Sequence, residues 1–411
     1  MNPPGKKQIA IVGAGAAGCF CAAQLHRMAG PAVSISLYEA GRRPLAKVAV
    51  TGGGRCNLTN TFEGIRSLSE AYPRGERLLS RALKAFSQRD TMAWFEAEGV
   101  ALTVQPDHCV FPRSQDAGEI VRTLLRAIPA QMPVHTGMRL QTLRRSGERW
   151  ALQFRDGTSA EADAVVVTTG GAPKGVSFLD ELAIEQVPPV PSLFSFVVRD
   201  AGLQSLMGLV IPEASVSLPG TPYRGEGPLL LTDWGLSGPA VLRLSSYAAR
   251  HLADKGYAAD LSVNWTALPE DAVREKLHAL ALDHPQKQLS STPLQGLPAR
   301  LWGMLLSRAG LREDLRWAEL GSKGKNRLVA TLTADPYRMT GRNPFREEFV
   351  TCGGVALSEV NLTTLEARRF PGLYFAGEVL DVDAVTGGFN LQAAWSTGYC
   401  VARSLAALCN P

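Results

Sequence analysis

Short apolar strands and helical patterns alternate at the N-terminal end of the chain. Residues 8–12 form a short β-branched run, which is typical of a buried parallel strand. Apolar residues then recur at Cys21, Leu25 and Met28 with the spacing of one helix face, and residues 33–38 predict a second strand. Strand, helix and strand in this order indicate a βαβ unit, so the sequence predicts an α/β fold.

A second group of strand patterns lies further along the chain. Residues 150–157 predict a hairpin around an Asp-Gly turn, and residues 164–171 predict a buried strand that runs into two glycines. Residues 372–378 repeat this strand-then-glycine pattern, and residues 392–408 predict a helix. The α/β domain is therefore expected to use both ends of the chain.

The middle of the chain has a different pattern. The proline-rich stretch at residues 188–191 marks an expected crossover, and Gly235-Leu-Ser-Gly-Pro239 predicts a helix start. Short strand patterns between Gly and Pro turns predict a barrel-like sheet, at residues 194–198, 214–218, 228–231 and 259–263. Helical patterns then follow at residues 271–282, 297–309 and 315–332.

The turn after the first strand carries candidate chemistry. Gly13-Ala-Gly15-Ala-Ala-Gly18 is a G-x-G-x-x-G motif between a strand and a helix, the arrangement that binds a dinucleotide. Gly13 allows the tight turn, Gly15 lets a pyrophosphate approach, and Gly18 lets the helix pack on the strand. Glu39, at the end of the second strand, can accept hydrogen bonds from a ribose and would repel a 2′-phosphate. This motif does not distinguish FAD from NAD.

A second glycine-rich stretch reads Thr51-Gly-Gly-Gly-Arg-Cys-Asn-Leu-Thr-Asn60. Its glycines let the backbone lie against a cofactor without a Cβ clash, and Arg55 provides a cation there. Asn57 is expected to cap a following helix. Cys56 could be a redox thiol, but the next cysteine in sequence is Cys109, so no local dithiol is encoded. We expect Cys56 to be a packing residue.

A third stretch, Thr386-Gly-Gly-Phe-Asn-Leu391, opens the C-terminal helix. A glycine turn at a helix N-terminus presents free N–H groups and the positive end of the helix dipole to an anion. The N1/C2=O region of a reduced flavin is such an anion, so this stretch favours FAD over NAD.

Three motifs of the chain together resemble those of the YhiN/BaiN-like bacterial flavoproteins. The motifs that carry the resemblance are Thr51–Asn60, Gly235-Leu-Ser-Gly-Pro239 and Gly377-Glu-Val-Leu-Asp-Val-Asp383 followed by Thr386-Gly-Gly-Phe-Asn390, in that order along the whole chain. The resemblance implies a Rossmann-type fold with non-covalent FAD and an NAD(P)H-linked redox role. One branch of the family reduces unsaturated steroid ketones. Ala384 stands where many members have glycine, Phe389 where tyrosine is usual, and Cys352 at a variable place. The first two differences bear on substrate access, which leaves the substrate open.

The resemblance also implies four segments and a set of site residues. Residues 1–190 and 345–411 would form the FAD-binding domain, residues 191–268 an inserted β-rich domain, and residues 269–344 an inserted helical region. The residues expected to bind the cofactor are Gly13, Ala14, Gly15, Ala16, Ala17, Gly18, Glu39, Ala40, Lys47, Gly52, Gly53, Gly54, Arg55, Cys56, Asn57, Val134, Thr169, Gly170, Gly377, Glu378, Gly387, Gly388, Phe389, Asn390 and Leu391.

Composition and charge narrow the choice of partners. The net charge of +5 and the pI of about 8.8 are mildly basic, and we interpret the basic spots at residues 144–145 and 323–327 as solvated faces. A nucleic-acid partner is therefore not expected. Seven scattered cysteines without a Cys-x-x-Cys, and six histidines without ligand spacing, favour a reducing cytoplasm and no metal site. No run is long enough for a membrane span.

The sequence thus predicts an FAD-dependent oxidoreductase that takes hydride from NAD(P)H at flavin N5. The acceptor would be a small, largely apolar molecule, with an activated C=C bond as one candidate. No second G-x-G-x-x-G marks a nicotinamide site, and no catalytic residue is specified; His108, Asp381 and Asp383 are candidates, the two aspartates also as loop-holding groups. A flavin-dependent RNA-modifying enzyme and a non-enzymatic flavin sensor are the alternatives. The oligomeric state is open.

Overall fold

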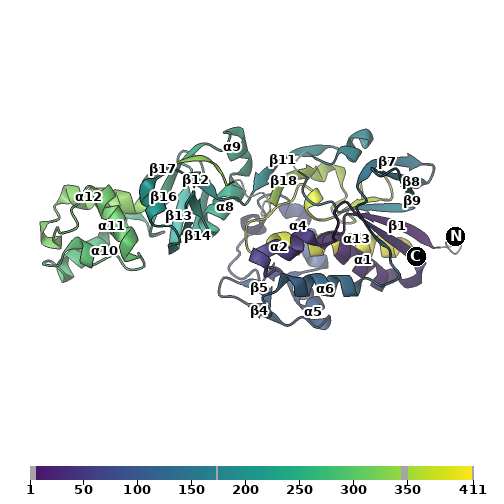
Figure 1. Cartoon of the computed structure of the whole chain (residues 1–411), viewed down its shortest axis with the longest axis horizontal. Coiled ribbons are helices and arrows are strands. Elements are labelled where there is room, and N and C mark those ends of the chain that lie inside the picture. Colours follow the sequence, from purple (N-terminus) through teal and green to yellow (C-terminus); the bar gives the residue numbers. More distant parts are fainter. Residues whose placement is uncertain (1–5, 173–174, 344–349, 410–411) are drawn as a thin grey trace. The chain divides into compact units, whose positions relative to one another are not determined.

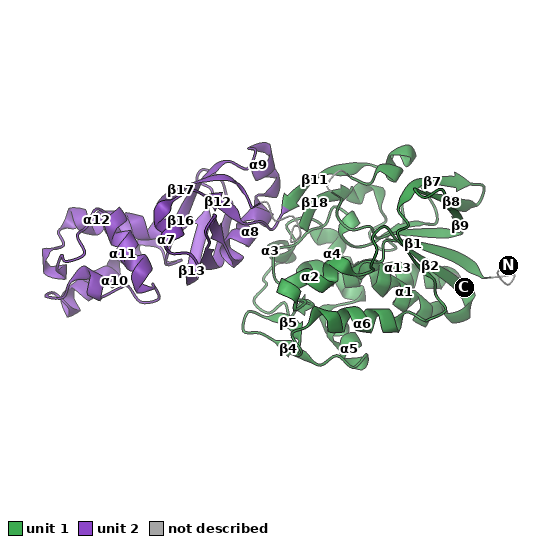
Figure 2. Cartoon of the chain, viewed as in Figure 1, with its two compact units in different colours: residues 1–191, 347–411 green, residues 192–346 purple. Residues whose placement is uncertain are grey.

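The computed structural model describes residues 6–172, 175–343 and 350–409. Two compact units divide the chain: unit 1 comprises residues 1–191 and 347–411, and unit 2 comprises residues 192–346 (Figure 2). Unit 1 thus contains both ends of the chain, and unit 2 is an insertion.

Unit 1 is built on a five-stranded parallel sheet. The strand order is β19-β10-β1-β2-β6. Its strands are β1 (Lys7–Val12), β2 (Val33–Glu39), β6 (Val134–Thr136), β10 (Ala164–Val167) and β19 (Leu373–Phe375). All residues of β10 and β19 are buried, as expected for parallel strands covered on both faces. The predicted Rossmann-type α/β fold is confirmed.

The first and last long helices of the chain pack together in unit 1. In Figure 1, α13 (Phe389–Cys409) lies beside α1 (Ala16–Ala29). A Cβ at Gly398 would lie 2.9 Å from the Ala17 carbonyl oxygen, so a glycine is needed where the two helices cross. The C-terminal segment thereby reaches the first glycine turn. The other helices of unit 1 are α2 (Ala46–Gly54), α3 (Leu68–Ala71), α4 (Glu76–Ala85), α5 (Gln88–Ala97) and α6 (Ala117–Ala127).

Three smaller sheets complete unit 1. One has the order β3-β5-β4, one the order β7-β8-β9, and one pairs β11 with β18. Their bounds are β3 (Thr59–Asn60), β4 (Leu102–Val104), β5 (Cys109–Pro112), β7 (Leu140–Ser146), β8 (Arg149–Phe154), β9 (Ser159–Ala162), β11 (Gln186–Ser192) and β18 (Val350–Val355). The hairpin predicted over residues 150–157 is confirmed by the pairing of β8 with β9. The helix expected after Asn57 is wrong, because β3 follows there.

Unit 2 contains a closed six-stranded barrel of the order β12-β15-β14-β13-β16-β17. The strands are β12 (Phe196–Val198), β13 (Val210–Ser217), β14 (Arg224–Leu231), β15 (Gly235–Ser237), β16 (Ala259–Asn264) and β17 (Asp335–Arg342). The predicted barrel-like sheet is confirmed, but β15 and β17 were not expected as strands. Because β17 pairs with both β12 and β16, the barrel closes only after the helical stretch has ended.

In unit 2 the fully buried side chains include the indoles of Trp265 and Trp302, and helices accompany the barrel. They are α7 (Ala201–Ser205), α8 (Pro239–Tyr247), α9 (Ala249–Asp254), α10 (Glu270–Asp283), α11 (Ala299–Arg308) and α12 (Ser322–Thr333). Single 3₁₀ turns occur at Gly30–Ala32, Ser177–Leu182, Leu289–Ser291, Trp317–Glu319, Leu357–Glu359 and Gly377–Val379. Within the described ranges, no helix has the length and apolar character needed to cross a bilayer.

Candidate cofactor site

The carboxyl ends of the parallel strands bring the predicted cofactor residues together. β1 ends at Val12 before Gly13, β2 ends at Glu39, β10 runs into Thr168 and Thr169, and β19 leads into Gly377. In open parallel sheets, ligands bind in the crevice outside these strand ends. Segments from both ends of the chain therefore meet where a dinucleotide is expected.

The first glycine turn shows why each of its three glycines is needed. A Cβ at Gly13, which has φ +110°, would lie 2.3 Å from the Thr168 carbonyl oxygen. A Cβ at Gly18 would lie 1.9 Å from the Gly13 carbonyl oxygen. In contrast, a Cβ at Gly15 would meet no atom within 4 Å. Gly13 and Gly18 are required for packing within the protein, whereas Gly15 faces open space that a ligand can occupy.

The start of α1 presents unused backbone donors beside that space. The first helical hydrogen bond runs from the Cys19 N–H to the Gly15 carbonyl oxygen (3.0 Å), and Gly15 is the N-cap residue. The N–H groups of Ala16, Ala17 and Gly18 therefore have no acceptor within the helix. Such a terminus favours an anionic group, and the diphosphate of a dinucleotide fits it.

Glu39 lies at the edge of the same turn. Its two carboxylate oxygens accept hydrogen bonds from the backbone N–H groups of Ala14 (2.9 Å) and Gly41 (2.7 Å). These bonds fix the carboxylate beside the glycine turn, and each oxygen keeps further acceptor capacity. Ala40, which follows, is exposed. The arrangement fits an acidic residue that receives ribose hydroxyl groups.

α2 carries Lys47 and the second glycine stretch. The Leu45 N–H, at the start of α2, donates to the Ala14 carbonyl oxygen (2.8 Å), which ties α2 to the first turn. Gly52, Gly53 and Gly54 all have positive φ, and a Cβ at Gly53 or Gly54 would meet no atom within 4 Å. The glycine stretch thus offers bare backbone at the surface, as the sequence predicts.

Two cations stand near these segments. Lys47 forms an ion pair with Glu378 (3.0 Å), and Glu378 also accepts the Thr351 N–H (2.7 Å). Arg55 places its guanidinium 4.7 Å from the centre of the Phe111 ring and donates to the Gly52 carbonyl oxygen (3.2 Å). Lys47 therefore joins the first and last parts of the site, and Arg55 is held at its margin.

The third glycine stretch contacts the second. With its amide oriented to satisfy both groups, Asn57 donates to the Thr59 carbonyl oxygen (3.1 Å) and accepts the Gly388 N–H (3.2 Å). Asn60 donates to the Gly387 carbonyl oxygen (3.0 Å). A Cβ at Gly388 would lie 2.3 Å from the Thr59 carbonyl oxygen, so only glycine fits. The second and third glycine stretches, both predicted to contact the flavin, are thus hydrogen-bonded and packed against each other.

The start of α13 offers a second set of backbone donors. Its first hydrogen bond runs from the Gln392 N–H to the Gly388 carbonyl oxygen (3.0 Å). The N–H groups of Phe389, Asn390 and Leu391 consequently have no acceptor within the helix. The Asn390 side chain closes the preceding loop through hydrogen bonds to the backbone of Ala384. This terminus is suited to stabilising negative charge on a bound group.

Of the remaining predicted residues, some lie just beyond the strand ends and one lies within the sheet. Thr169 and Gly170 directly follow β10, and Gly170 lies beside the Glu378 carboxylate. Gly377 contacts the first turn of α1, because a Cβ there would lie 2.8 Å from the Ala17 Cβ. Val134 is level with Leu37, two residues before the strand end at Glu39, so it stands apart from the others.

Cys56 is a buried thiol in a left-handed backbone conformation (φ 60°). Burial raises the pKa of Cys56 to about 12, against a smaller opposing effect of the hydrogen bond to Thr51. A thiol with this pKa is protonated at neutral pH and is a poor nucleophile. Cys56 is a free thiol, as are the buried Cys19, Cys21 and Cys400. These observations agree with a packing role.

We therefore expect Cys56→Ala to leave flavin binding and reduction within about twofold of wild type, at a stability cost of about 1 kcal/mol. FAD titration and anaerobic stopped-flow reduction measure the first, and urea unfolding measures the second. Cys21→Ala is the matched control, since Cys21 is also fully buried with a pKa raised by burial to about 12. Loss of reduction in a folded Cys56→Ala variant alone would reveal a redox thiol.

The three candidate catalytic residues differ in burial and in their contacts. Asp383 is fully buried and paired with Arg74, so it serves the loop and is not a free acid. Asp381 is half-buried, with its N–H bonded to the Val355 carbonyl oxygen (3.0 Å). His108 is partly exposed, and its Nδ1 lies 3.6 Å from a carboxylate oxygen of Glu63. The sequence did not point to Arg74, since a lone arginine after a short helix carries no motif.

The site also uses residues that sequence reasoning missed. Thr168 donates its hydroxyl to the carbonyl oxygens of Gly13 (2.7 Å) and Val12 (3.1 Å), which holds the first turn against β10. Tyr72 donates its hydroxyl to the Phe389 carbonyl oxygen (2.9 Å). Asn60 could have been found from the sequence, because it is the last residue of the second glycine stretch. No cluster of three or more His, Cys, Asp or Glu suited to a metal ion occurs in the part of the chain that the structure describes.

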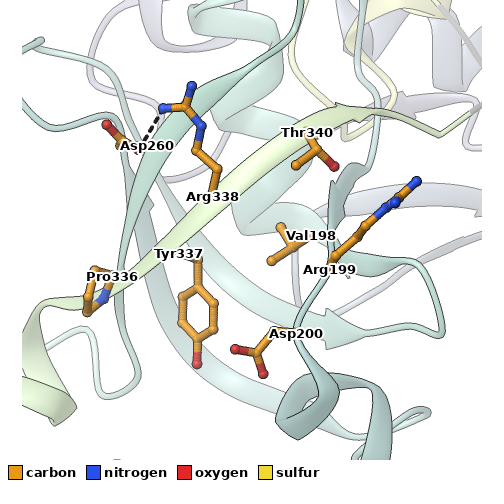
Figure 3. A pocket seen from close by; sticks show the side chains of 8 residues that line it. All are labelled: Val198, Arg199, Asp200, Asp260, Pro336, Tyr337, Arg338 and Thr340. Atoms are coloured by element: carbon orange, nitrogen blue, oxygen red, sulfur yellow. Dashed lines mark hydrogen bonds and ion pairs between the residues drawn. The ribbon is translucent and has the colours of Figure 1, made fainter.

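A pocket of about 400 Å³ occurs in unit 2. It opens on the barrel strands β12, β16 and β17, and Figure 3 shows Arg338 turned toward Asp260 (2.7 Å). The other lining residues are Val198, Arg199, Asp200, Pro336, Tyr337 and Thr340. Its mixed charges include two acids beside two arginines, so it resembles neither a diphosphate cradle nor an apolar substrate site.

The fold and the site define a Rossmann-type dinucleotide-binding protein. A family model described as the HI0933-like protein Rossmann domain matches residues 7–404. The chain therefore belongs to the HI0933-like family, and the resemblance carried by the three motifs is confirmed.

Two relatives of known name span nearly the whole chain. The ribosomal RNA dihydrouridine synthase of Escherichia coli is 30% identical over 410 residues, which cover 97% of each chain. The 3-dehydro-bile acid delta(4,6)-reductase of Clostridium scindens is 28% identical over 413 residues, 97% of this chain and 99% of the relative. Both relatives are named as enzymes.

A solved structure supports the fold. The 3-ketosteroid delta1-dehydrogenase from Sterolibacterium denitrificans superimposes with a TM-score of 0.52 at 13% identity, covering 98% of this chain and 100% of the dehydrogenase. At this identity the likeness concerns the fold alone.

Proposed function

We propose that this protein is an FAD-dependent reductase of C=C bonds conjugated to a carbonyl group. The observation that carries the proposal is the meeting of three glycine segments and two helix N-termini at the strand ends of the Rossmann unit. These segments leave open backbone where a dinucleotide can lie. Bound FAD would supply the hydride, with NAD(P)H as its proposed source.

The two named relatives support this choice of chemistry. Formation of dihydrouridine adds two hydrogens to the C5=C6 bond of uracil, which is conjugated to the C4 carbonyl. A delta(4,6)-reductase of a 3-oxo steroid acts on C=C bonds conjugated to the 3-oxo group. In both reactions the carbonyl makes a carbon of the conjugated system electrophilic, the β-carbon of an enone or the δ-carbon of a dienone. Hydride adds at that carbon, and a proton then adds to the conjugated enolate. One reaction type therefore accounts for both names.

Each part of the site has a proposed role. The N–H groups at the start of α1 and the Glu39 carboxylate would hold the diphosphate and the ribose. Lys47 and Glu378 would lie along the cofactor between the two helix termini. The N–H groups of residues 389–391 would stabilise negative charge at the reacting end. Asp383 has no part in proton transfer, because its carboxylate is buried and paired.

We propose a uracil base in ribosomal RNA as the substrate. The Escherichia coli relative, at 30% identity over 97% of both chains, supports this choice. The net charge of +5 is compatible with binding to a polyanion such as RNA, although the charge alone did not predict a nucleic-acid partner. A steroid enone is the second candidate, which the bile-acid reductase relative supports at 28% identity.

The test combines a spectrum with two substrate assays. Purified protein should show flavin absorption bands that bleach under anaerobic titration with NADH or NADPH. The reduced protein should then be mixed with unmodified ribosomal RNA or with a 4-en-3-one steroid. Dihydrouridine in the RNA, measured by mass spectrometry of nucleosides, is the expected product.

Each outcome separates the candidates. Flavin reoxidation by the steroid and not by RNA would favour the second candidate. Reduction without reoxidation by any acceptor would favour a flavin sensor. Absence of flavin bands after FAD has been added would overturn the cofactor assignment.

A further inference from the structure

A buried ion pair joins two distant parts of unit 1 next to the third glycine stretch. Arg74 donates from Nη2 to Oδ2 of Asp383 (2.5 Å) and from Nε to Oδ1, so the pair is bidentate. The Asp383 side chain has no exposed surface, and that of Arg74 is 17% exposed. The partners are 309 residues apart in sequence.

The ion pair is the centre of a longer contact between residues 71–75 and residues 382–389, which we call the clasp. Arg74 and Asp383 form an isolated antiparallel bridge, and the Val385 N–H donates to the Ala71 carbonyl oxygen (2.9 Å). Tyr72 donates its hydroxyl to the Phe389 carbonyl oxygen (2.9 Å). Backbone, side-chain and charge contacts thus hold the same loop along its length.

The loop held by the clasp leads directly into the helix terminus of the candidate site. Residues 384–388 separate Asp383 from α13, and none of these five residues lies in a helix or a strand. Gly387 and Gly388 have φ of 129° and 89°, conformations that residues with a Cβ rarely adopt. Within the loop, the Asn390 side chain bonds to the Ala384 backbone. From outside, Asn57 and Asn60 hold the loop on one side and the clasp holds it on the other.

A buried ion pair is weak evidence for stability, because the desolvation of two charges offsets their attraction. Well-packed apolar residues often replace such a pair without loss of stability. The bidentate geometry instead fixes both the distance and the relative orientation of the two side chains, since each of two guanidinium nitrogens must meet its own carboxylate oxygen. A bidentate pair next to a glycine loop is consequently suited to positioning that loop.

We propose that Arg74 is a positioning residue for the candidate flavin site. It acts through Asp383 to hold residues 384–388, and thereby sets where the N–H groups at the start of α13 point. The inference rests on the proposed function for the identity of the group that these N–H groups face. The position of the loop itself can be measured without any cofactor.

The experiment compares wild type with Arg74→Met and with the double variant Arg74→Met/Asp383→Leu. Hydrogen exchange of residues 382–391 in FAD-free protein reports the loop, and the melting temperature reports stability. The FAD dissociation constant and the flavin midpoint potential report the site. Arg149→Met is the matched control, because Arg149 pairs with Glu161 (2.6 Å) at the surface of the same unit.

We expect Arg74→Met to speed exchange in the loop and to raise the FAD dissociation constant about tenfold, from loss of a buried pair. The midpoint potential should become more negative, because misdirected N–H groups stabilise the reduced flavin less. The double variant should regain the melting temperature, since no unpaired buried charge remains, but should keep the fast exchange and the shifted potential. Arg149→Met should change none of these quantities.

A double variant that recovers exchange, affinity and potential together with stability would overturn the positioning role, since the pair would then matter only through its charge balance. Unchanged loop exchange in a folded Arg74→Met variant would overturn it as well. Failure of the proposed function looks different: wild-type protein would bind no FAD, while the exchange comparison would still decide whether Arg74 holds the loop.

Discussion

A Gly15→Val variant will fold like the wild type and will not hold its dinucleotide. A Cβ at Gly15 meets no atom within 4 Å, and the backbone there is extended (φ −87°), which a valine tolerates. The side chain would instead fill the space in front of the unused N–H groups of α1. Losing several charge-assisted hydrogen bonds should weaken FAD binding by about 100-fold or more. FAD titration and circular-dichroism melting of the FAD-free protein measure the two effects.

Two comparison variants make this result decisive. Gly321→Val alters another N-cap glycine with open space and no positive φ, at the start of α12, and should change neither FAD binding nor folding. Gly13→Ala should destabilise the fold itself by about 3 kcal/mol, because of its positive φ and a contact with Thr168. If Gly15→Val keeps wild-type FAD affinity, the cofactor does not lie at this turn.

The Rossmann-type unit could be predicted from sequence because its signals are local. The strand before Gly13, the helix after Gly18 and the acid at Glu39 lie in one short segment, and each has its own pattern. The glycines that the structure requires, such as Gly388, were visible as glycines. Their contact partners were not, because the Thr59 carbonyl oxygen reaches Gly388 across more than 300 residues of chain.

The barrel shows where local patterns stop being sufficient. β17 reads Asp-Pro-Tyr-Arg-Met-Thr-Gly-Arg, and its Pro, Gly and charges argue against a strand. Its alternation is nevertheless clear in the structure, with Tyr337 and Met339 buried and Arg338 and Thr340 exposed. Pairing with β12 and β16 overrides the weak propensity of this segment. A strand recruited after the intervening helices has no signal in its own neighbourhood.

The same limit explains why Asp383 was a candidate acid and Arg74 was not a candidate at all. An aspartate beside a glycine-rich motif suggests chemistry, since polar groups collect at sites. Its charge is instead neutralised by an arginine from a segment without a motif. Burial and pairing are properties of the folded chain, so sequence spacing could propose the aspartate but could not assign its role.

Charge pairing of this kind also predicts a large effect in unit 2. Asp335 is buried, and Oδ2 accepts hydrogen bonds from the Trp265 indole N–H (3.0 Å) and the Tyr337 hydroxyl (2.6 Å). Oδ1 accepts from Nε (3.0 Å) and Nη2 (2.8 Å) of Arg308. Burial, with the Asp335 charge adding to it, raises the pKa of Tyr337, so its hydroxyl remains a donor. Arg308 is the cation that balances this carboxylate.

Arg308→Met should therefore destabilise unit 2 by about 3 kcal/mol, because it leaves a buried carboxylate without its cation. Urea unfolding followed by tryptophan fluorescence measures the loss, since Trp265 contacts the same carboxylate. Adding Asp335→Asn should recover part of it by removing the charge.

Arg338→Met is the matched control, because Arg338 lies in β17 next to Tyr337 and also forms an ion pair. Arg338 pairs with Asp260 (2.7 Å), but both side chains are largely exposed, so its loss should cost no more than about 0.5 kcal/mol. Equal effects of Arg308→Met and Arg338→Met would mean that Asp335 is stabilised by its neutral donors alone. The barrel would then owe its closure to apolar packing and not to the charge network beneath β17.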